Sequence, residues 1–176
     1  LGGGPATVRE LLEADVLDDL KRAGGNPVGL TGEVELLPPV PDPEKIVCIG
    51  LNYRAHAAEA GIDPPEVPTF FAKFRNALVA DGATVPLPAA SEKVDFEAEV
   101  AFVVGRTAKD VAVSDALDHV AGYTLLNDLS ARDLQFQTPQ WIPGKVFDGS
   151  APCGPALVTP DEAGAPDAIG LTLDLD

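Results

Sequence analysis

The chain contains no methionine, one tryptophan and only two cysteines, Cys48 and Cys153. The two cysteines lie far apart in the sequence and form no CxxC pair, which excludes the usual zinc and dithiol redox motifs. We therefore expect buried free thiols rather than a disulfide. Because a chain without methionine begins here at Leu1, we also expect that further residues preceded it in the natural protein.

Basic residues are scarce as well, since 12 Lys and Arg stand against 28 Asp and Glu, for a net charge of −16. Binding to phosphates needs clustered cations, so this composition argues against nucleic acids and anionic membranes as partners. No apolar run approaches the roughly 18 residues that a membrane-spanning helix needs. No leader pattern is visible at the amino terminus, so the sequence favours a cytoplasmic protein.

The sequence predicts two unequal parts, residues 1–43 and 44–176. Residues 7–24 have the apolar spacing of a short amphipathic helix, which ends at two glycines. The proline-rich segment 38–43 cannot be helical and makes a poor central strand. We place the joint there, between a small N-terminal lobe and one main domain with a well-buried core.

Short apolar runs separated by Gly and Pro predict the elements of the main domain. Strands are expected at 46–50, 70–74, 94–104, 123–126 and 156–158, and the alternating segment 171–176 has the pattern of another. Helices are expected at 54–60 and 114–120, and a loop or strand edge at 141–149.

The segment 94–104 carries the clearest chemical signal. Its even-numbered positions are all apolar, which predicts a strand with that face in a core and with Glu97 and Glu99 together on the other face. Asp128 would complete a cluster of three carboxylates if the fold returns it to the same point. Carboxylates about 5 Å apart repel each other by roughly 3 kcal/mol per pair at an effective dielectric near 20. Such a cluster needs a cation or protons.

His56 and Glu59 form a second candidate pair. They lie three positions apart in the expected helix 54–60, so they share a face and can hydrogen-bond. This is the arrangement of a general base and the group that orients it. His119 lies near the carboxyl end of the expected helix 114–120, where a structural role is favoured.

Taken together, several segments over about residues 38–176 resemble the fumarylacetoacetate hydrolase family, including its acylpyruvases and 2-hydroxyhepta-2,4-diene-1,7-dioate isomerases. These segments are Gly50-Leu51-Asn52-Tyr53 with His56 and Glu59, Asp95-Phe96-Glu97-Ala98-Glu99, Ala121-Gly122-Tyr123, Asn127 to Asp133, Trp141 with Gly144-Lys145, and Gly154-Pro155. The resemblance implies an α+β fold, a mixed β-sheet roll with few helices. It also implies a homodimer with one divalent cation per site, usually Mg²⁺ and in some members Mn²⁺ or Ca²⁺.

The resemblance further implies roles for individual residues. Glu97, Glu99 and Asp128 correspond to the metal ligands, and all-oxygen ligation suits these hard cations. His56 and Glu59 correspond to a water-activating dyad on a lid, and Lys145 to a lysine that faces the substrate. Tyr53, Arg132 and Gln135 correspond to substrate-contacting positions, where Arg132 would be a natural clamp for a carboxylate.

From this resemblance we expect a metal-dependent hydrolase that cleaves a carbon–carbon bond in a β-diketo acid or acylpyruvate by way of an enolate. Isomerisation of a hydroxymuconate-type dienoate and decarboxylation of an oxaloacetate-like acid are alternatives on the same site. Family domains continue beyond the position of residue 176, so we expect the catalytic domain to be incomplete at its carboxyl end. A non-catalytic binding or assembly subunit is therefore a third alternative.

Overall fold

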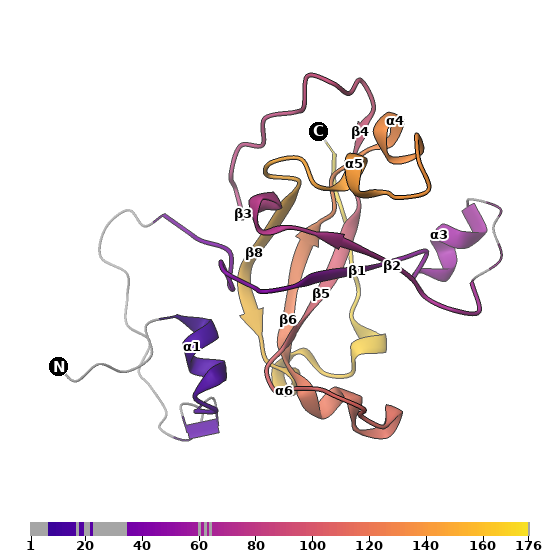
Figure 1. Ribbon diagram of the computed structural model, residues 1–176. Helices are drawn as coiled ribbons and strands as arrows, with labels where there is room; N and C mark the ends of the chain where they lie inside the picture. Colours follow the sequence, from indigo (N-terminus) through magenta and orange to yellow (C-terminus); the bar gives the residue numbers. More distant parts are fainter. Residues whose placement is uncertain are drawn as a thin grey trace.

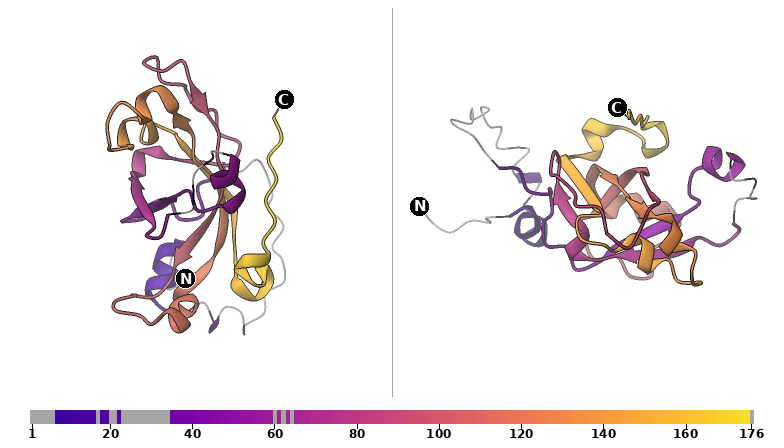
Figure 2. Two further views of the ribbon diagram at one scale, coloured as in Figure 1. Left: turned by 90° about the vertical axis from the view of Figure 1, so that its right-hand side faces the viewer. Right: turned by 90° about the horizontal axis from the view of Figure 1, so that it is seen from above.

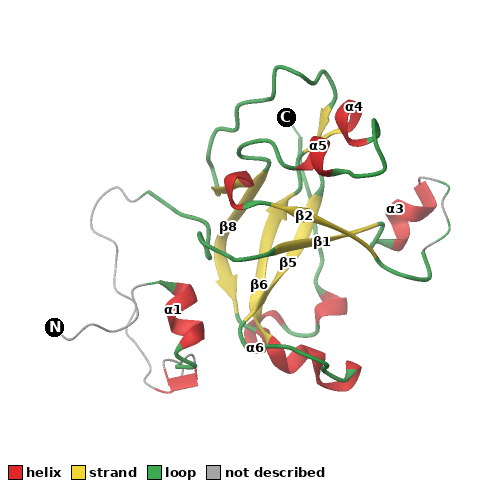
Figure 3. Cartoon of the chain, viewed as in Figure 1, coloured by secondary structure: helices red, strands yellow, loops and turns green. Residues whose placement is uncertain are grey.

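The computed structural model describes residues 7–16, 18–19, 22, 35–59, 61, 63 and 65–175. Its centre is a four-stranded mixed sheet with the strand order β3-β8-β6-β5 (Figure 1; strands are yellow in Figure 3). The strands are β3 (Leu78–Ala80), β8 (Ala151–Val158), β6 (Val120–Asn127) and β5 (Ala98–Val104). β3 runs parallel to β8, and the other neighbours are antiparallel. The mixture of sheets and short helices confirms the predicted α+β class.

An antiparallel ribbon of β1 (Ile46–Gly50) and β2 (Thr69–Lys73) lies across one face of this sheet (Figures 1 and 2). Its side chains alternate, because successive residues of a strand point to opposite faces. The outer face exposes Val47, Ile49 and Phe70 by 62%, 44% and 63%. The inner face carries Phe71 and the almost completely buried Lys73. The ribbon thereby places a lysine between two layers of sheet.

A second small ribbon lies next to two short helices. β4 (Val94–Asp95) pairs with β7 (Ser130–Ala131), and α4 (Arg132–Gln135) and α5 (Ile142–Lys145) follow β7. α5 sits very close to this ribbon, since a Cβ atom on Gly144 would lie 2.5 Å from the Ala131 carbonyl oxygen and 2.6 Å from the Gln135 nitrogen. The glycine therefore allows the helix to carry Lys145 into the interior.

Helix α3 (Arg54–Glu59) stands away from the central sheet, on the side where β1 ends (Figures 1 and 2). Leu51, which joins β1 to α3, has a φ of +56°, a conformation that costs a branched side chain about 1 kcal/mol. Further helices are α1 (Val8–Glu13), α6 (Pro160–Ala163) and short 3₁₀ helices at Arg75–Ala77, Val113–His119 and Pro166–Ala168, and residues 18, 19 and 22 are helical as well. Within the described residues, no helix has both the length and the apolar character needed to cross a membrane.

The strand predicted at 46–50 is confirmed with its bounds, and the helix predicted at 54–60 is confirmed over 54–59, since residue 60 lies outside the described residues. The strand predicted at 70–74 is displaced by one residue. The single strand predicted at 94–104 is wrong in one respect, because it breaks at residues 96–97 into β4 and β5. The break lets β4 pair with β7 while β5 pairs with β6. The apolar face expected in a core is also partly exposed, by 54% at Phe102 and 62% at Val104.

Other predictions were wrong in extent or type. The expected helix 7–24 is interrupted: α1 ends at Glu13, Asp15 has a φ of +53° that an α-helix does not contain, and residues 18, 19 and 22 are helical again. Residues 17, 20–21 and 23–24 of this prediction lie outside the described residues. The helix expected at 114–120 is a 3₁₀ helix, and Val120 already belongs to β6. The loop or strand edge expected at 141–149 contains α5. Residues 171–175 form no strand, because no described segment pairs with them. The division at residue 43 stays a prediction.

Candidate active site

The site begins where the break at residues 96–97 meets the end of β6. The Glu97 amide donates a hydrogen bond to the Asn127 Oδ1 atom at 3.1 Å. The Asp128 amide in turn donates to the Glu97 carbonyl at 2.8 Å. These bonds hold two acidic residues side by side although they lie about 30 positions apart in the sequence.

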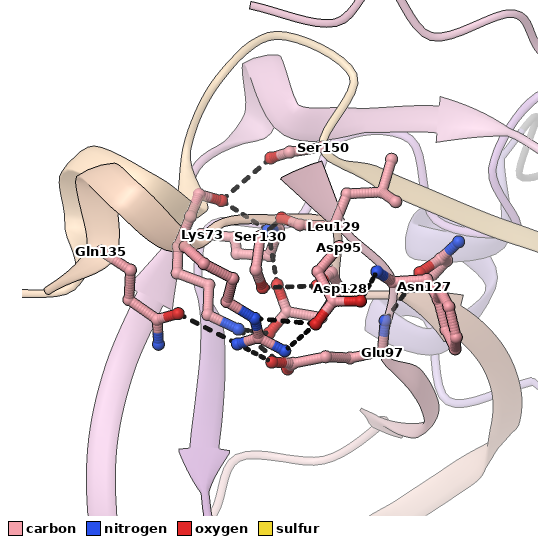
Figure 4. A network of polar contacts seen from close by, with 12 residues as sticks. Lys73, Asp95, Glu97, Asn127, Asp128, Leu129, Ser130, Gln135 and Ser150 are labelled. Atoms are coloured by element: carbon pink, nitrogen blue, oxygen red, sulfur yellow. Dashed lines mark hydrogen bonds and ion pairs between the residues drawn. The ribbon is translucent and has the colours of Figure 1, made fainter. Parts of the chain in front are cut away.

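Lys145 joins the two carboxylates. Its Nζ atom lies 2.8 Å from Glu97 Oε2 and 3.0 Å from Asp128 Oδ2, and its side chain is almost completely buried. Figure 4 shows the Glu97 and Asp128 carboxylates close together. The same ammonium lies 4.9 Å from the centre of the Phe71 ring on β2. The structure therefore brings together three of the residues predicted from the sequence: Glu97, Asp128 and Lys145.

Arg132 occupies the other side of Glu97. Its Nη1 atom lies 2.6 Å from Glu97 Oε1 and its Nη2 atom 2.8 Å from Asp95 Oδ2. It also donates to the Gln135 side chain at 3.0 Å. Burial works against its charge, but the Glu97 and Asp95 carboxylates outweigh it and raise the pKa of Arg132. The predicted carboxylate clamp is thus engaged with carboxylates of the protein itself.

Sequence reasoning missed two members of this network, Lys73 and Asp95. Lys73 is 1% exposed, and its Nζ atom lies 2.6 Å from Asp128 Oδ1. Burial lowers the pKa of Lys73, and the Asp128 carboxylate opposes that shift. A usable signal existed, because Lys73 is the only charged residue of an apolar strand and shares the face of Phe71. Asp95 belongs to the Asp95-Phe96-Glu97-Ala98-Glu99 segment that carries the family resemblance, but nothing in the sequence indicated that it would bind Arg132.

Glu99 lies beside the network on β5. Its pKa is raised to about 7, chiefly by burial and in smaller part by the neighbouring Glu97 and Asp128 carboxylates, against the hydrogen bonds with Tyr53 and Asn52, which lower it. The Tyr53 hydroxyl also accepts a hydrogen bond from the Val100 amide at 3.4 Å. All three predicted carboxylates are therefore close enough to interact electrostatically, and Tyr53 lies beside them.

The three carboxylates have the donor chemistry of a hard-cation site. The raised pKa of Glu99 comes mainly from burial and in part from the Glu97 and Asp128 carboxylates, and a cation would offset both causes. Among the described residues, however, no three acidic, His or Cys side chains converge tightly enough to hold an ion. The ammonium of Lys145 bridges Glu97 and Asp128 instead. Glu97, Glu99 and Asp128 thus fit a divalent cation in residue type and in charge. In this structure the ammonium of Lys145 binds the oxygens of Glu97 and Asp128.

His56 and Glu59 are not part of this assembly. Both side chains are exposed on α3. No hydrogen bond or ion pair between described residues joins them to each other or to Glu97, Glu99 and Asp128. The pair predicted to activate water thus lies outside the cluster that the structure assembles.

Residues 45–176 match the sequence family described as fumarylacetoacetate (FAA) hydrolase, C-terminal domain. This chain belongs to the fumarylacetoacetate hydrolase family. Its similarity to one member, the mitochondrial oxaloacetate tautomerase fahd2 of Xenopus laevis, is 40% identity over 173 residues, which cover 95% of this chain and 54% of the relative. The chain thus spans about half the length of that family member.

Two solved structures of family members are also similar. The 2-hydroxyhepta-2,4-diene-1,7-dioate isomerase from Mycobacterium marinum matches with a TM-score of 0.61 and 40% identity, over 70% of this chain and 44% of that one. The fumarylpyruvate hydrolase from Pseudomonas aeruginosa, solved in complex with Mn²⁺ and pyruvate, matches with a TM-score of 0.62 and 37% identity, over 70% and 56%. These similarities and the mixed sheet agree with the fold expected from the sequence.

Proposed function

We propose that this protein is an isomerase or tautomerase that enolises a small 2-oxo acid or a related dienoate. One observation carries the proposal: the cationic and carboxylate groups are assembled around Glu97 and Asp128, whereas the pair that would activate water is exposed on α3. The oxaloacetate tautomerase and the isomerase among the similar proteins support the same choice. The carbon–carbon hydrolase expected first from the sequence becomes the second candidate.

The chemistry of enolisation suits such a site. The carbon next to the keto group gives up a proton to a base, the electron pair of that C–H bond forms a carbon–carbon double bond, and the keto oxygen becomes an enolate. A proton then returns to that oxygen in a tautomerase, or to a distant carbon in an isomerase. No water is consumed, so the reaction chiefly needs positive charge where the oxyanion forms. Lys145 would supply it, and one such group is worth about 10² to 10³ in rate.

Glu97, Glu99 and Asp128 would hold the divalent cation, Mg²⁺ or alternatively Mn²⁺ or Ca²⁺. When bound, that ion polarises a keto oxygen as a Lewis acid. The all-carboxylate donor set supports this assignment. Because Lys145 binds oxygens of Glu97 and Asp128, a cation there would compete with it and free its ammonium for the substrate.

Arg132, Gln135 and Tyr53 would bind the substrate. The guanidinium of Arg132 presents paired donors that match a carboxylate. It now binds Asp95 and Glu97, so a substrate carboxylate would have to displace the latter contact. Gln135 is buried against Arg132 and would hold it in position.

Hydrolysis of an acylpyruvate is the second candidate, favoured by the similarity to a fumarylpyruvate hydrolase. It requires His56 and Glu59 to approach the cluster, which means a movement of α3. Decarboxylation of oxaloacetate would use the same groups as enolisation. A non-catalytic role is the remaining alternative.

A single set of assays separates these functions. The purified full-length protein is given Mg²⁺ and either oxaloacetate or an acylpyruvate, and enol absorbance, CO₂ release and cleavage products are followed. We expect the protein to convert the enol and keto forms of oxaloacetate faster than they interconvert in buffer. His56→Ala should retain this activity, and Lys145→Met should reduce it at least 10²-fold. Glu162→Gln, an exposed carboxylate on α6, is the matched control for Glu97→Gln. The opposite outcome is that the wild type cleaves the acylpyruvate, that His56→Ala loses this cleavage, and that the wild type does not speed enol–keto conversion. That outcome would establish hydrolysis instead.

Two further properties belong to this proposal. We expect a homodimer, which light scattering of the purified protein would detect as twice the monomer mass. The cytoplasmic location expected from the sequence also stays a prediction, and the similar tautomerase of Xenopus laevis is a mitochondrial protein.

A further inference from the structure

We propose that Lys73 is a positioning residue that fixes Asp128 so that only its Oδ2 atom can bind a cation. This inference rests on the proposed function, because it concerns a residue assigned there as a metal ligand. Lys73 itself would touch neither metal nor substrate.

All three donors of the Lys73 ammonium are used within the protein. The Nζ atom binds Asp128 Oδ1 at 2.6 Å, the Leu129 carbonyl at 3.3 Å and the Lys145 carbonyl at 2.5 Å. A lysine has three donors and no acceptor. With 1% of the residue exposed, no donor is left for a ligand.

These contacts tie together three separate segments of the site. Lys73 ends β2, Asp128 and Leu129 connect β6 to β7, and Lys145 ends α5. The Ser150 hydroxyl donates to the same Lys145 carbonyl at 2.9 Å, which fixes this end of α5 a second time (Figure 4). The backbone that carries Lys145 and the carboxylate of Asp128 are thereby placed relative to each other by one buried cation.

The two lysines on Asp128 differ in a way that indicates different roles. Lys145 binds only side-chain oxygens, Glu97 Oε2 and Asp128 Oδ2, so another cation can replace it there. Lys73 binds two backbone carbonyls besides Asp128 Oδ1, and its departure would take a donor from the Leu129 carbonyl and leave the Lys145 carbonyl with the Ser150 hydroxyl alone. A metal ion is therefore expected to displace Lys145 and to leave Lys73 in place, with Oδ1 still occupied.

The first test is the affinity of the full-length protein for Mn²⁺, measured by the loss of the free-ion signal in electron paramagnetic resonance. Lys73→Met and Lys73→Gln are expected to weaken binding about 10- to 100-fold, as removal of groups that orient a metal ligand does. Lys145→Met should bind at least as tightly as the wild type, since it removes a competing cation. Lys109→Met, at an exposed lysine, is the matched control.

A second test needs no substitution of Lys73 and so does not depend on how such a variant folds. Infrared difference spectra of protein labelled with ¹³C at the Asp carboxyl groups, with and without Mg²⁺, report whether an Asp binds through one oxygen or two. We expect the wide band splitting of a carboxylate bound through one oxygen, absent in Asp128→Asn.

The outcomes separate this inference from the proposed function. A wild type that binds neither ion overturns both. A wild type that binds Mn²⁺, with the narrow splitting of a two-oxygen Asp ligand or with unchanged affinity in folded Lys73→Gln, overturns the role of Lys73 alone.

Discussion

Two buried ammonium groups converge on the carboxylate of Asp128. This residue is 3% exposed, and its two oxygens bind ammonium groups from β2 and α5. A buried ion pair adds little stability in itself, but removal of one partner leaves the other charge buried without compensation. The same carboxylate is therefore both a proposed ligand and a structural requirement.

Asp128→Asn should destabilise the protein by about 3 to 5 kcal/mol, because Lys73 would keep its charge in a buried position without a counter-charge. Urea unfolding of the wild type and the variant measures this difference. Asp167→Asn, at an exposed carboxylate, should stay within about 0.5 kcal/mol of the wild type. A loss below about 1 kcal/mol for Asp128→Asn would contradict the buried ion pairs described above.

Cys48 offers a test of the electrostatics beneath the site. Burial, reinforced by the Asp128 carboxylate, raises the pKa of its thiol to about 12. Cys48 should therefore be alkylated by iodoacetamide at pH 8 far more slowly than in the denatured chain, as mass spectrometry of the labelled peptide would show.

The same pKa predicts a pH dependence of stability. An unfolded thiol loses its proton near pH 8.5, whereas the native thiol keeps it, so the native state binds more protons above that pH. The contribution of Cys48 is complete below about pH 8.5 and is lost as the pH rises towards about 12. The wild type should therefore lose stability relative to Cys48→Ala as the pH rises from 8 to 10. An unchanged stability difference between the two proteins would contradict the raised pKa.

At the scale of elements, α5 is held against β1 and β2 by aromatic packing. Trp141, the residue before α5, lies against Gly50 at the end of β1, and its ring centre is 5.5 Å from that of Phe71. A Cβ atom on Gly50 would lie 2.5 Å from the Trp141 ring. Any side chain at residue 50 must therefore displace the tryptophan that precedes the Lys145 helix.

Gly50→Ala should cost about 1 to 3 kcal/mol of stability through overpacking, and it should lower activity by shifting α5. Because Trp141 is the only tryptophan, its fluorescence reports the displacement directly. Gly170→Ala, where an added Cβ meets nothing within 4 Å, is the control. An unchanged spectrum and unchanged stability in Gly50→Ala would contradict this packing.

Patterns confined to one element were predictable from the sequence, and contacts between elements were not. Short apolar runs bounded by Gly and Pro located β1 and β2, and the period of 2 placed Glu97 and Glu99 on one face of a strand. The family resemblance, rather than spacing, assigned Asp128 and Lys145 to the same site. The break at residues 96–97 was not predictable, because it depends on which strands pair with each half. Lys73 was missed for the same reason, since its partner Asp128 lies 55 positions away.

At the scale of the whole molecule, several large apolar side chains remain exposed on the ribbons and the sheet. Val47 and Phe70 are exposed on the outer face of the β1–β2 ribbon, and Phe102 and Val104 on β5, each by more than half. Exposed apolar patches of this kind mark contact surfaces in many proteins. They are consistent with the homodimer that the family resemblance implies.

The proposed function requires that the cluster around Glu97, Asp128 and Lys145 enolise an oxo acid. Nuclear magnetic resonance in D₂O measures this directly, as exchange of the hydrogens next to the keto group of oxaloacetate with solvent. We expect the wild type with Mg²⁺ to speed this exchange well above the buffer rate and a chelator to abolish the effect. Lys145→Met should reduce the exchange rate at least 10²-fold, whereas Glu162→Gln should not. Exchange at the buffer rate in the wild type, or equal exchange in wild type and Lys145→Met, would contradict the proposed function.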